Sequence, residues 1–438
     1  MESKGSGANA TALNPNSVIE LKPTRQRVIL VLILLVTLLI AYLDRVNVSV
    51  LLADNVFLTE MGIKGQPIQM GLLMTLFLIA YGVSNVFLSP LGDYLGPRKA
   101  MSLSILLWGG SLFLGGIAAT FTTMLAARVI LGIGEGMHWP MQSKYVKNWF
   151  PPHERGKANA VWVVGLMAGP AIAMPFLTWA IQSYGWRTSF FILVAFGLIP
   201  LILLWFCTTD YPHQHKGANQ AERDYIEAGQ KAEKALEAQA GHTTVWENMK
   251  VFIFDYHFWL VTLYYFCLAS IFWGTMAWLP SYLKVARGFS WAAMGAFSAL
   301  PYILGVASVL ASGYISDKMG RRAPVCVVSM LGASAGIYFG AYAPDNTTAA
   351  ILISVGIASI GLGIAPAWAL VQEIVPGKAI GAGAGMMNGV SNGGSAFSPV
   401  LMGFFISVTG SYVGGLMFLV GLGLFAACCA AVLSYQKY

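Results

Sequence analysis

Long apolar stretches alternate with short polar segments along most of the chain. A bilayer core about 30 Å thick is crossed by a helix of about 20 apolar residues, so each stretch is long enough to span a membrane. The stretches are continuous and do not alternate in polarity, which favours helices over the strands of a barrel. Apolar runs between charged and Gly/Pro breaks predict twelve spans, at 28–51, 70–90, 100–119, 122–143, 158–181, 188–208, 256–280, 293–315, 323–342, 348–372, 380–406 and 411–434.

One long polar segment separates the first six predicted spans from the last six. Its part at 221–237 has the mixed charges of a solvated helix, so we interpret the segment as a linker between two halves. The pattern therefore predicts five parts: a cytoplasmic N-terminal tail (1–27), a six-helix bundle (28–208), a cytoplasmic linker (209–255), a second six-helix bundle (256–434) and a cytoplasmic C-terminus (435–438).

Composition and charge agree with a membrane protein. Hydrophobic residues make up 57% of the 438 positions and charged residues only 10%, whereas soluble domains carry about 25% charged residues. Of the 26 Lys and Arg residues, 20 fall in loops on one side of the predicted topology and four on the other. The positive-inside rule therefore predicts cytoplasmic termini, and it explains the net charge of +7 without a nucleic-acid partner. The five cysteines lie in apolar runs without metal-ligand spacing, so no cofactor is expected.

Loops of similar design follow the second and the eighth predicted spans. Residues 89–99 read SPLGDYLGPRK and residues 313–322 read GYISDKMGRR, each with a Gly three residues after the Asp and basic residues next to it. The Gly permits a tight turn, and an Asp at a helix end can hold an Arg or a neighbouring helix N-terminus. The repeat predicts a conformational latch on the cytoplasmic side, although two ordinary charged loops remain an alternative. The latch residues would be Asp93, Arg98, Asp317, Arg321 and Arg322.

These loops resemble the signature loop of the major facilitator superfamily, Gly-x-x-x-Asp-basic-x-Gly-basic-basic. The second copy is nearly complete, whereas the first has Ser89 in place of the leading Gly and Tyr94 in place of a basic residue. The resemblance implies an all-α integral membrane fold of 12 transmembrane helices, in two six-helix bundles related by an axis along the membrane normal.

Four charged residues lie inside the first and fourth predicted spans. A charge at bilayer depth costs about 2.5 to 3.5 kcal/mol or more, so such residues usually have a function. Arg128 and Glu135 are seven residues apart and share a helical face, while Asp44 and Arg45 are adjacent. Helix rise places Asp44 and Arg128 at similar depths, so we predict that these two pair and that Arg45 and Glu135 face the same cavity.

This set of charges suits the binding of an organic anion together with protons. A guanidinium group holds both oxygens of a carboxylate, while burial favours a protonated carboxyl group and a nearby Arg favours its charged form. Our hypothesis is that Asp44 and Glu135 carry protons, and that Arg45 and Arg128 hold the anion. The alternative is that the four charges only neutralise one another and fix helix packing.

Further motifs resemble the anion:cation symporter branch of the superfamily, which includes bacterial sugar-acid importers for galactonate, glucarate and hexuronates, as well as sialin and vesicular glutamate transporters. The motifs are YLDRVN at 42–47, Arg128 with Glu135, NWFPPHERGKA at 148–158, GWR at 185–187 and AExxYI at 221–226.

The resemblance implies proton coupling at Asp44 and Glu135, with substrate or gating roles for Arg45 and Arg128. It adds Tyr42, Tyr265 and Asn388 to the expected substrate site. Tyr265 replaces a glutamine of galactonate carriers, which leaves room for a less polar or aromatic carboxylate.

The sequence thus predicts a secondary active transporter that imports an organic anion by proton symport through alternating access. We expect a monomer in the plasma membrane, in bacteria the inner membrane, with no cofactor besides the coupling proton. A proton-coupled antiporter or efflux carrier remains an alternative, because residues 165–170 (GLMAGP) partly match a drug/proton antiporter motif. An enzyme is not expected, because the G-x-S-x-G pattern at 332–336 lies inside a predicted span with no strand before it.

Overall fold

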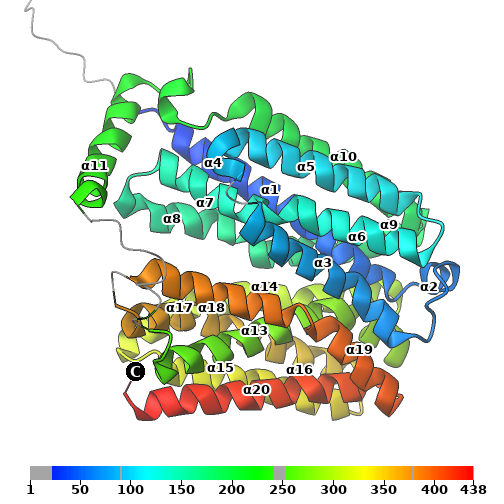
Figure 1. Ribbon diagram of the computed structural model, residues 1–438. Helices are drawn as coiled ribbons and strands as arrows, with labels where there is room; N and C mark the ends of the chain where they lie inside the picture. Colours follow the sequence, from blue (N-terminus) through cyan, green and yellow to red (C-terminus); the bar gives the residue numbers. More distant parts are fainter. Residues whose placement is uncertain (1–21, 89–90, 240–249, 251, 377–378, 438) are drawn as a thin grey trace, which may run out of the picture.

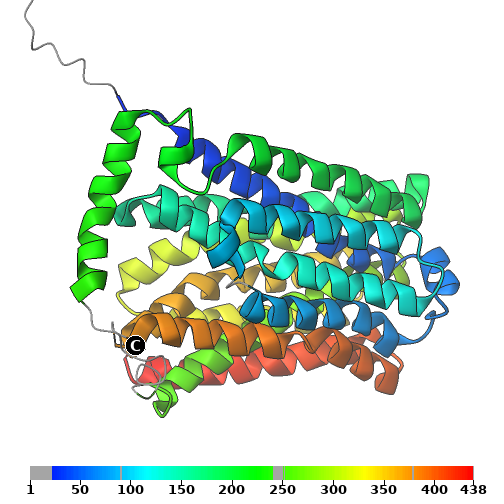
Figure 2. The same ribbon diagram turned by 45° about the horizontal axis from the view of Figure 1, so that its top comes forward.

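The computed structural model describes residues 22–88, 91–239, 250, 252–376 and 379–437, and these residues form helices and connecting loops. Most of the predicted N-terminal tail and part of the predicted linker lie outside them. The helices form two layers, with α1 to α10 in one and α13 to α20 in the other (Figures 1 and 2). The linker helix α11 (Gln220–Gln239) stands across one end of the molecule, which we call the α11 end.

The first layer contains two short helices and eight longer ones. The short helices are α2 (Asn55–Glu60), which marks the opposite end of the molecule and gives the α2 end its name, and α4 (Leu91–Leu95). The longer ones are α1 (Gln26–Leu51), α3 (Pro67–Phe87), α5 (Pro97–Gly116), α6 (Phe121–Gly136), α7 (His138–Trp149), α8 (Pro152–Val163), α9 (Gly165–Tyr184) and α10 (Trp186–Cys207).

The second layer consists of one π-helical turn and the remaining helices. Its helices are α13 (Tyr256–Ser281), which continues into the π-helical turn η2 (Tyr282–Ala286), α14 (Trp291–Met319), α15 (Ala323–Tyr342), α16 (Asn346–Ser359), α17 (Gly361–Ile374), α18 (Ile380–Ser395), α19 (Ser398–Thr409) and α20 (Tyr412–Tyr435).

Nine stretches of the described residues are long and apolar enough to cross a membrane. They are α1, α3, α8 with α9, α10, α13 with η2, α14, α15, α16 with α17, and α20. The other three predicted spans correspond to α5, to α6 with α7, and to α18 with α19. Two of these three are broken in mid-course, at Met137 and at Ala396–Phe397. Short, interrupted helices of this kind accompany binding sites in membrane transporters.

Glycines make the predicted tight turns in both repeated loops. Gly96 has φ +78° directly before α5, and Gly320 has φ +59° directly after α14. Positive φ is the conformation that glycine adopts without steric cost. The prediction that each loop needs its glycine for a turn is therefore confirmed.

The two layers are in contact between α9 and α14 and, at the α2 end, between α3 and α19. There α19 packs on α3 so tightly that a Cβ on Gly71 would lie 2.6 Å from the carbonyl oxygen of Pro399. The Val400 amide donates to Thr75 Oγ1 at 3.3 Å across the same contact. Toward the α11 end, α18 makes only a small contact with α3. The helices therefore converge at the α2 end and diverge toward the α11 end.

Candidate functional site

The four charged residues of the first and fourth predicted spans lie in one layer, on α1 and α6. Asp44, Arg45, Arg128 and Glu135 are exposed by only 1%, 4%, 1% and 0%. The charged residues that act electrostatically on Asp44 are the other three members of the set. The structure thus brings together the four residues that the sequence analysis singled out.

Arg45 pairs with Glu135. Its Nε donates to Glu135 Oε2 at 2.6 Å, between side chains that are 5% and 0% exposed. The guanidinium carbon also lies 4.8 Å from the ring centre of Tyr42 and 4.9 Å from that of Tyr81. Aromatic faces attract a cation, and the carboxylate neutralises it, so both groups compensate for the removal of Arg45 from water.

Among the described residues, α3 and no acidic side chain holds Arg128. Its Nε donates to the carbonyl oxygen of Leu73 at 3.1 Å, and its guanidinium carbon lies 4.6 Å from the ring centre of Phe77. Neither Asp44 oxygen has a hydrogen-bond partner among the described residues. The predicted Asp44–Arg128 ion pair is therefore wrong in this structure. Helix rise gave similar heights for the two residues, but height does not determine the direction in which each side chain points.

Small residues allow α6 to approach α3 closely. A Cβ on Gly132 would lie 2.8 Å from Ala80 Cβ, and one on Gly136 would lie 2.6 Å from the Tyr81 carbonyl oxygen. Ser84 Oγ donates to the carbonyl oxygen of Ile133 at 2.7 Å in the same contact. Close approach through small residues is how membrane helices pack, and here it brings α6, which carries Glu135, against α3, whose Tyr81 ring faces Arg45.

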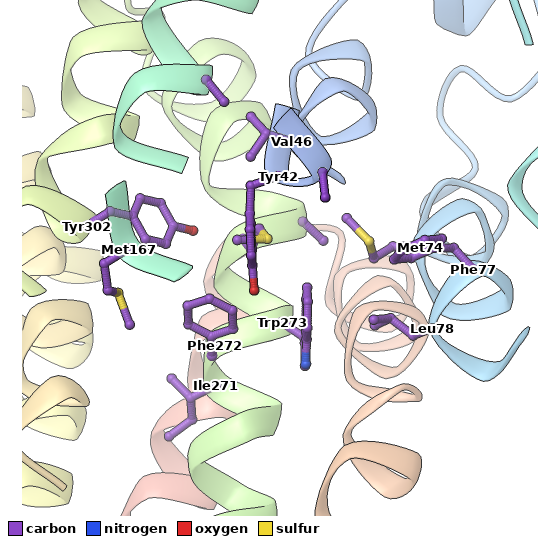
Figure 3. Close-up of a cluster of buried hydrophobic side chains, with 14 of the residues drawn as sticks. Tyr42, Val46, Met74, Phe77, Leu78, Met167, Ile271, Phe272, Trp273 and Tyr302 are labelled. Atoms are coloured by element: carbon purple, nitrogen blue, oxygen red, sulfur yellow. The ribbon is translucent and has the colours of Figure 1, made fainter. Parts of the chain in front are cut away.

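Aromatic side chains from both layers meet beside the charged residues. Tyr42 extends from α1 toward Phe272 and Trp273 of α13, with Tyr302 of α14 to one side (Figure 3). Tyr42 and Tyr302 are both 1% exposed. Tyr42 is thus the predicted site residue that reaches from the charged set to the other layer.

The other two predicted substrate residues lie in the second layer. Tyr265 Oη accepts a hydrogen bond from Trp368 Nε1 at 3.2 Å, and the side chain of Asn388 accepts one from Asn392 Nδ2 at 2.7 Å. Both are partly exposed. No bond of either residue to the four charged residues is present in the described part of the structure.

The basic residues of the predicted latch have identifiable partners. The Arg98 amide donates to Asp210 Oδ1 at 2.7 Å, Arg321 donates to the carbonyl oxygen of Ser434, and Arg322 pairs with Glu373. The side chains of Asp93 and Asp317 lie outside the described residues. The sequence analysis did not identify Asp210 as a partner at this end.

A buried acid in the linker was also missed. Glu222 of α11 is 0% exposed, although the sequence suggested a solvated helix. It accepts hydrogen bonds from Thr24 Oγ1 at 2.6 Å and from the backbone amides of Gln26 and Arg27 at 3.2 Å, at the N-terminus of α1. It also pairs with Arg27 Nη1 at 3.1 Å. The AExxYI motif was the sequence signal that could have identified it.

Comparison with known proteins shows the superfamily to which the chain belongs. The family model described as Major Facilitator Superfamily matches residues 34–399 and 310–437. The chain belongs to this superfamily, whose members are transporters and not enzymes, and the predicted family and fold class are confirmed. Its multi-pass membrane location follows from the same match.

Two relatives by sequence and two by structure are similar to most of the chain. The "Probable sulfoacetate transporter SauU" of Cupriavidus necator is 32% identical, over 85% of this chain and 86% of that protein. The "D-galactonate transporter" of Escherichia coli is 26% identical, over 87% and 90%. Among solved structures, an inward-facing bacterial homolog of the lysosomal transporter Spinster has a TM-score of 0.75 at 19% identity, covering 94% of this chain and 98% of its own. A D-xylose–proton symporter has a TM-score of 0.69 at 15% identity, covering 91% and 96%. At these identities, both structures support the fold alone.

Proposed function

We propose that this protein imports an organic anion, a carboxylate or a related acid, together with protons. The observation that carries the proposal is the buried Arg45–Glu135 pair at the centre of the first layer. The relatives named as sulfoacetate and sugar-acid transporters support an acidic substrate. We place the protein in a bacterial inner membrane, as a monomer with the α11 end in the cytoplasm.

Arg45 can exchange Glu135 for the substrate anion as its negative partner. This exchange would couple anion transport to proton transport. Arg45 needs an anion beside it, because an unpaired charge in a buried site costs several kcal/mol. When Glu135 is ionised, it supplies that anion through the 2.6 Å contact between Arg45 Nε and Glu135 Oε2. When Glu135 is protonated, the substrate carboxylate takes its place. Protonation of Glu135 and binding of the anion therefore favour each other.

Asp44 and Arg128 are the second acid and base of the site. Asp44 has no hydrogen-bond partner among the described residues, and neither does Arg128 Nη2. A buried carboxyl group without partners is favoured in its protonated form. We assign Asp44 as a second proton carrier, and Arg128 as a second contact for the anion.

Alternating access would expose this site to each side in turn. The close packing of α3 and α19 at the α2 end, with divergence toward the α11 end, fits a state that opens toward the cytoplasm. Tyr42, Tyr265 and Asn388 would contact the part of the substrate beyond its acidic group. The latch residues Asp93, Arg98, Asp317, Arg321 and Arg322 would hold the α11 end closed in the opposite state.

Uptake into proteoliposomes tests this function. The purified full chain is reconstituted and offered sulfoacetate, D-galactonate, D-glucarate and benzoate, with an external pH electrode. We expect saturable uptake of at least one acid, with alkalinisation of the external medium. Acidification on substrate addition would indicate antiport, and uptake of none of these acids would remove the proposed function.

A further inference from the structure

A row of buried polar side chains continues from Glu135 along α6 and α7. Glu135, His138 and Gln142 are spaced by three and four residues, and Met137 between α6 and α7 keeps helical backbone angles (φ −74°, ψ −19°). The three residues therefore lie on one face over about 10 Å. All three are buried. The row runs toward the α11 end, where Trp149 Nε1 at the end of α7 donates to the carbonyl oxygen of Thr209.

Each member of the row has a buried polar atom without a partner in the described part of the structure. These atoms are Glu135 Oε1, His138 Nε2 and Gln142 Oε1. Folded proteins pair nearly all of their buried polar atoms, either with protein groups or with ordered water. Three such atoms at positions three and four residues apart, on one helical face, are therefore better explained by a function than by packing.

The neighbouring helices hold the row in position. Gln142 Nε2 donates to the carbonyl oxygen of Leu34 on α1 at 2.9 Å, which fixes the orientation of the amide. The His138 ring lies edge-on to Trp108 of α5, with ring centres 6.0 Å apart. The charged group that acts on His138 is Arg45 on α1, and α5 contributes the uncharged Trp108 at this contact.

Beyond Gln142, the row reaches a tyrosine on the same face. Tyr145 Oη and Thr208 Oγ1 are 2.9 Å apart, and Thr208 donates to the carbonyl oxygen of Leu204 at 2.7 Å. Because the Thr208 proton is already used, Tyr145 is the donor of the first bond. The partly exposed Asp210 lies close enough to act on Tyr145. This end of the row thus approaches the surface at the α11 end.

We propose that His138 and Gln142 form a path by which the proton on Glu135 leaves toward the α11 end. This inference rests on the proposed function, because it assigns an exit to the coupled proton. A neutral imidazole can accept a proton on one nitrogen and release one from the other. Gln142 orients a water molecule beside the ring and gains no charge.

The transfers conserve protons and need no other reactant. The O–H bond of protonated Glu135 breaks and an N–H bond forms on His138. The other N–H bond of the ring then breaks, and the proton passes to the water beside Gln142 and from there to water at the α11 end. Glu135 is left ionised, which is the form that pairs with Arg45.

Two transport assays separate a proton path from a packing role. Net uptake driven by a proton gradient requires proton release, whereas counterflow exchange of labelled for unlabelled substrate does not. Both are measured in proteoliposomes of the full chain, with the acid from the panel of sulfoacetate, D-galactonate, D-glucarate and benzoate that gives the fastest uptake. The variant His138→Phe keeps a ring beside Trp108 but removes both nitrogens, and Gln142→Leu removes the amide.

We expect His138→Phe to lower proton-driven uptake by about tenfold or more, in line with the loss of a proton-transfer group, and to leave counterflow within about twofold of the parent. Gln142→Leu should show the same pattern with a smaller loss. Ser143→Ala, an exposed control on another face of α7, should change neither assay.

Equal loss of both activities in His138→Phe and in Gln142→Leu would make the two residues packing residues and overturn the proposal. Unchanged driven uptake in both variants would overturn it as well. Failure of the parent to couple any of the four acids to protons would instead remove the proposed function.

Discussion

The two layers share a fold but differ in the charges that they bury. The first layer buries two acids and two arginines on α1 and α6, with His138 beside them. The sequence of the second layer has no Asp, Glu, Lys or Arg between Tyr256 and Ser281 of α13, and none in the first 26 residues of α14. Tyr265 and Asn388, the predicted substrate residues of this layer, are uncharged.

This difference suggests a division of labour. The buried charges give the first layer the groups that can hold an anion and exchange protons. The uncharged side chains of the second layer can contact the rest of a substrate but can couple nothing to a proton gradient. Substitutions in the first layer should therefore affect coupling, and substitutions in the second should affect selectivity.

The largest effect should come from Arg45→Ala. This change removes the cation that pairs with the buried Glu135, and breaking one side of a buried ion pair costs about 3 to 5 kcal/mol. We expect loss of uptake and a clearly lower melting temperature in detergent. Combining it with Glu135→Gln should restore much of the stability but not the uptake. If Arg45→Ala alone were as stable as the parent, the result would contradict the structural importance of the pair.

The second-largest effect should come from a change at the contact between the layers. Gly71→Leu would force a side chain against the Pro399 backbone, and overpacking of this kind costs about 1 to 3 kcal/mol. We expect slower transport and a wider α2 end, measured as the distance between spin labels at Lys64 and Ser407 in a cysteine-free background. Gly82→Leu on the same helix should change neither quantity, because a Cβ on Gly82 has no atom within 4 Å. The same distance in parent and Gly71→Leu would argue against closure at this contact.

The linker should prove to be part of the first layer. Glu222→Ala removes a buried carboxylate that accepts hydrogen bonds at the start of α1, and bonds to charged groups contribute about 1.5 to 3 kcal/mol. We expect a lower melting temperature, with little change in substrate affinity. Glu227→Ala, an exposed position on α11, is the control. Equal melting temperatures for the two variants would show that the linker contact contributes little.

The smallest effect should come from the second layer. Asn388→Ala removes one amide, and a single neutral hydrogen bond contributes about 0.5 to 1.5 kcal/mol, which corresponds to about a two- to tenfold change in KM. We expect unchanged coupling to protons, followed with a pH-sensitive dye inside proteoliposomes. Gly389→Ala, in open space one residue further, should leave KM unaltered. Loss of coupling in Asn388→Ala would break the proposed division between the layers.

Much of the fold could be predicted from the sequence, because the hydrophobic thickness of a bilayer sets the length of each span. The positions of the four buried charges followed from the same reasoning. Their partners did not, because the depth of a residue gives no information on the direction of its side chain. Arg45 was expected to face the substrate but pairs with Glu135, and Asp44 was expected to pair with Arg128 but has no described partner.

The linker shows a second limit. Glu222 belongs to a segment of mixed charge, which predicted a solvated helix, yet it is buried by contacts with residues almost 200 positions earlier in the chain. Such contacts depend on how α11 packs against the start of α1, and local composition contains no information on that packing.

The central claim is that Glu135 either carries a proton or is ionised and pairs with Arg45. Glu135→Gln keeps the size of the side chain and cannot ionise, so the most direct measurement compares its proton-driven uptake with its counterflow in the same proteoliposomes. The account predicts that driven uptake is lost while counterflow continues. Driven uptake at the parent rate would show that Glu135 is not a proton carrier.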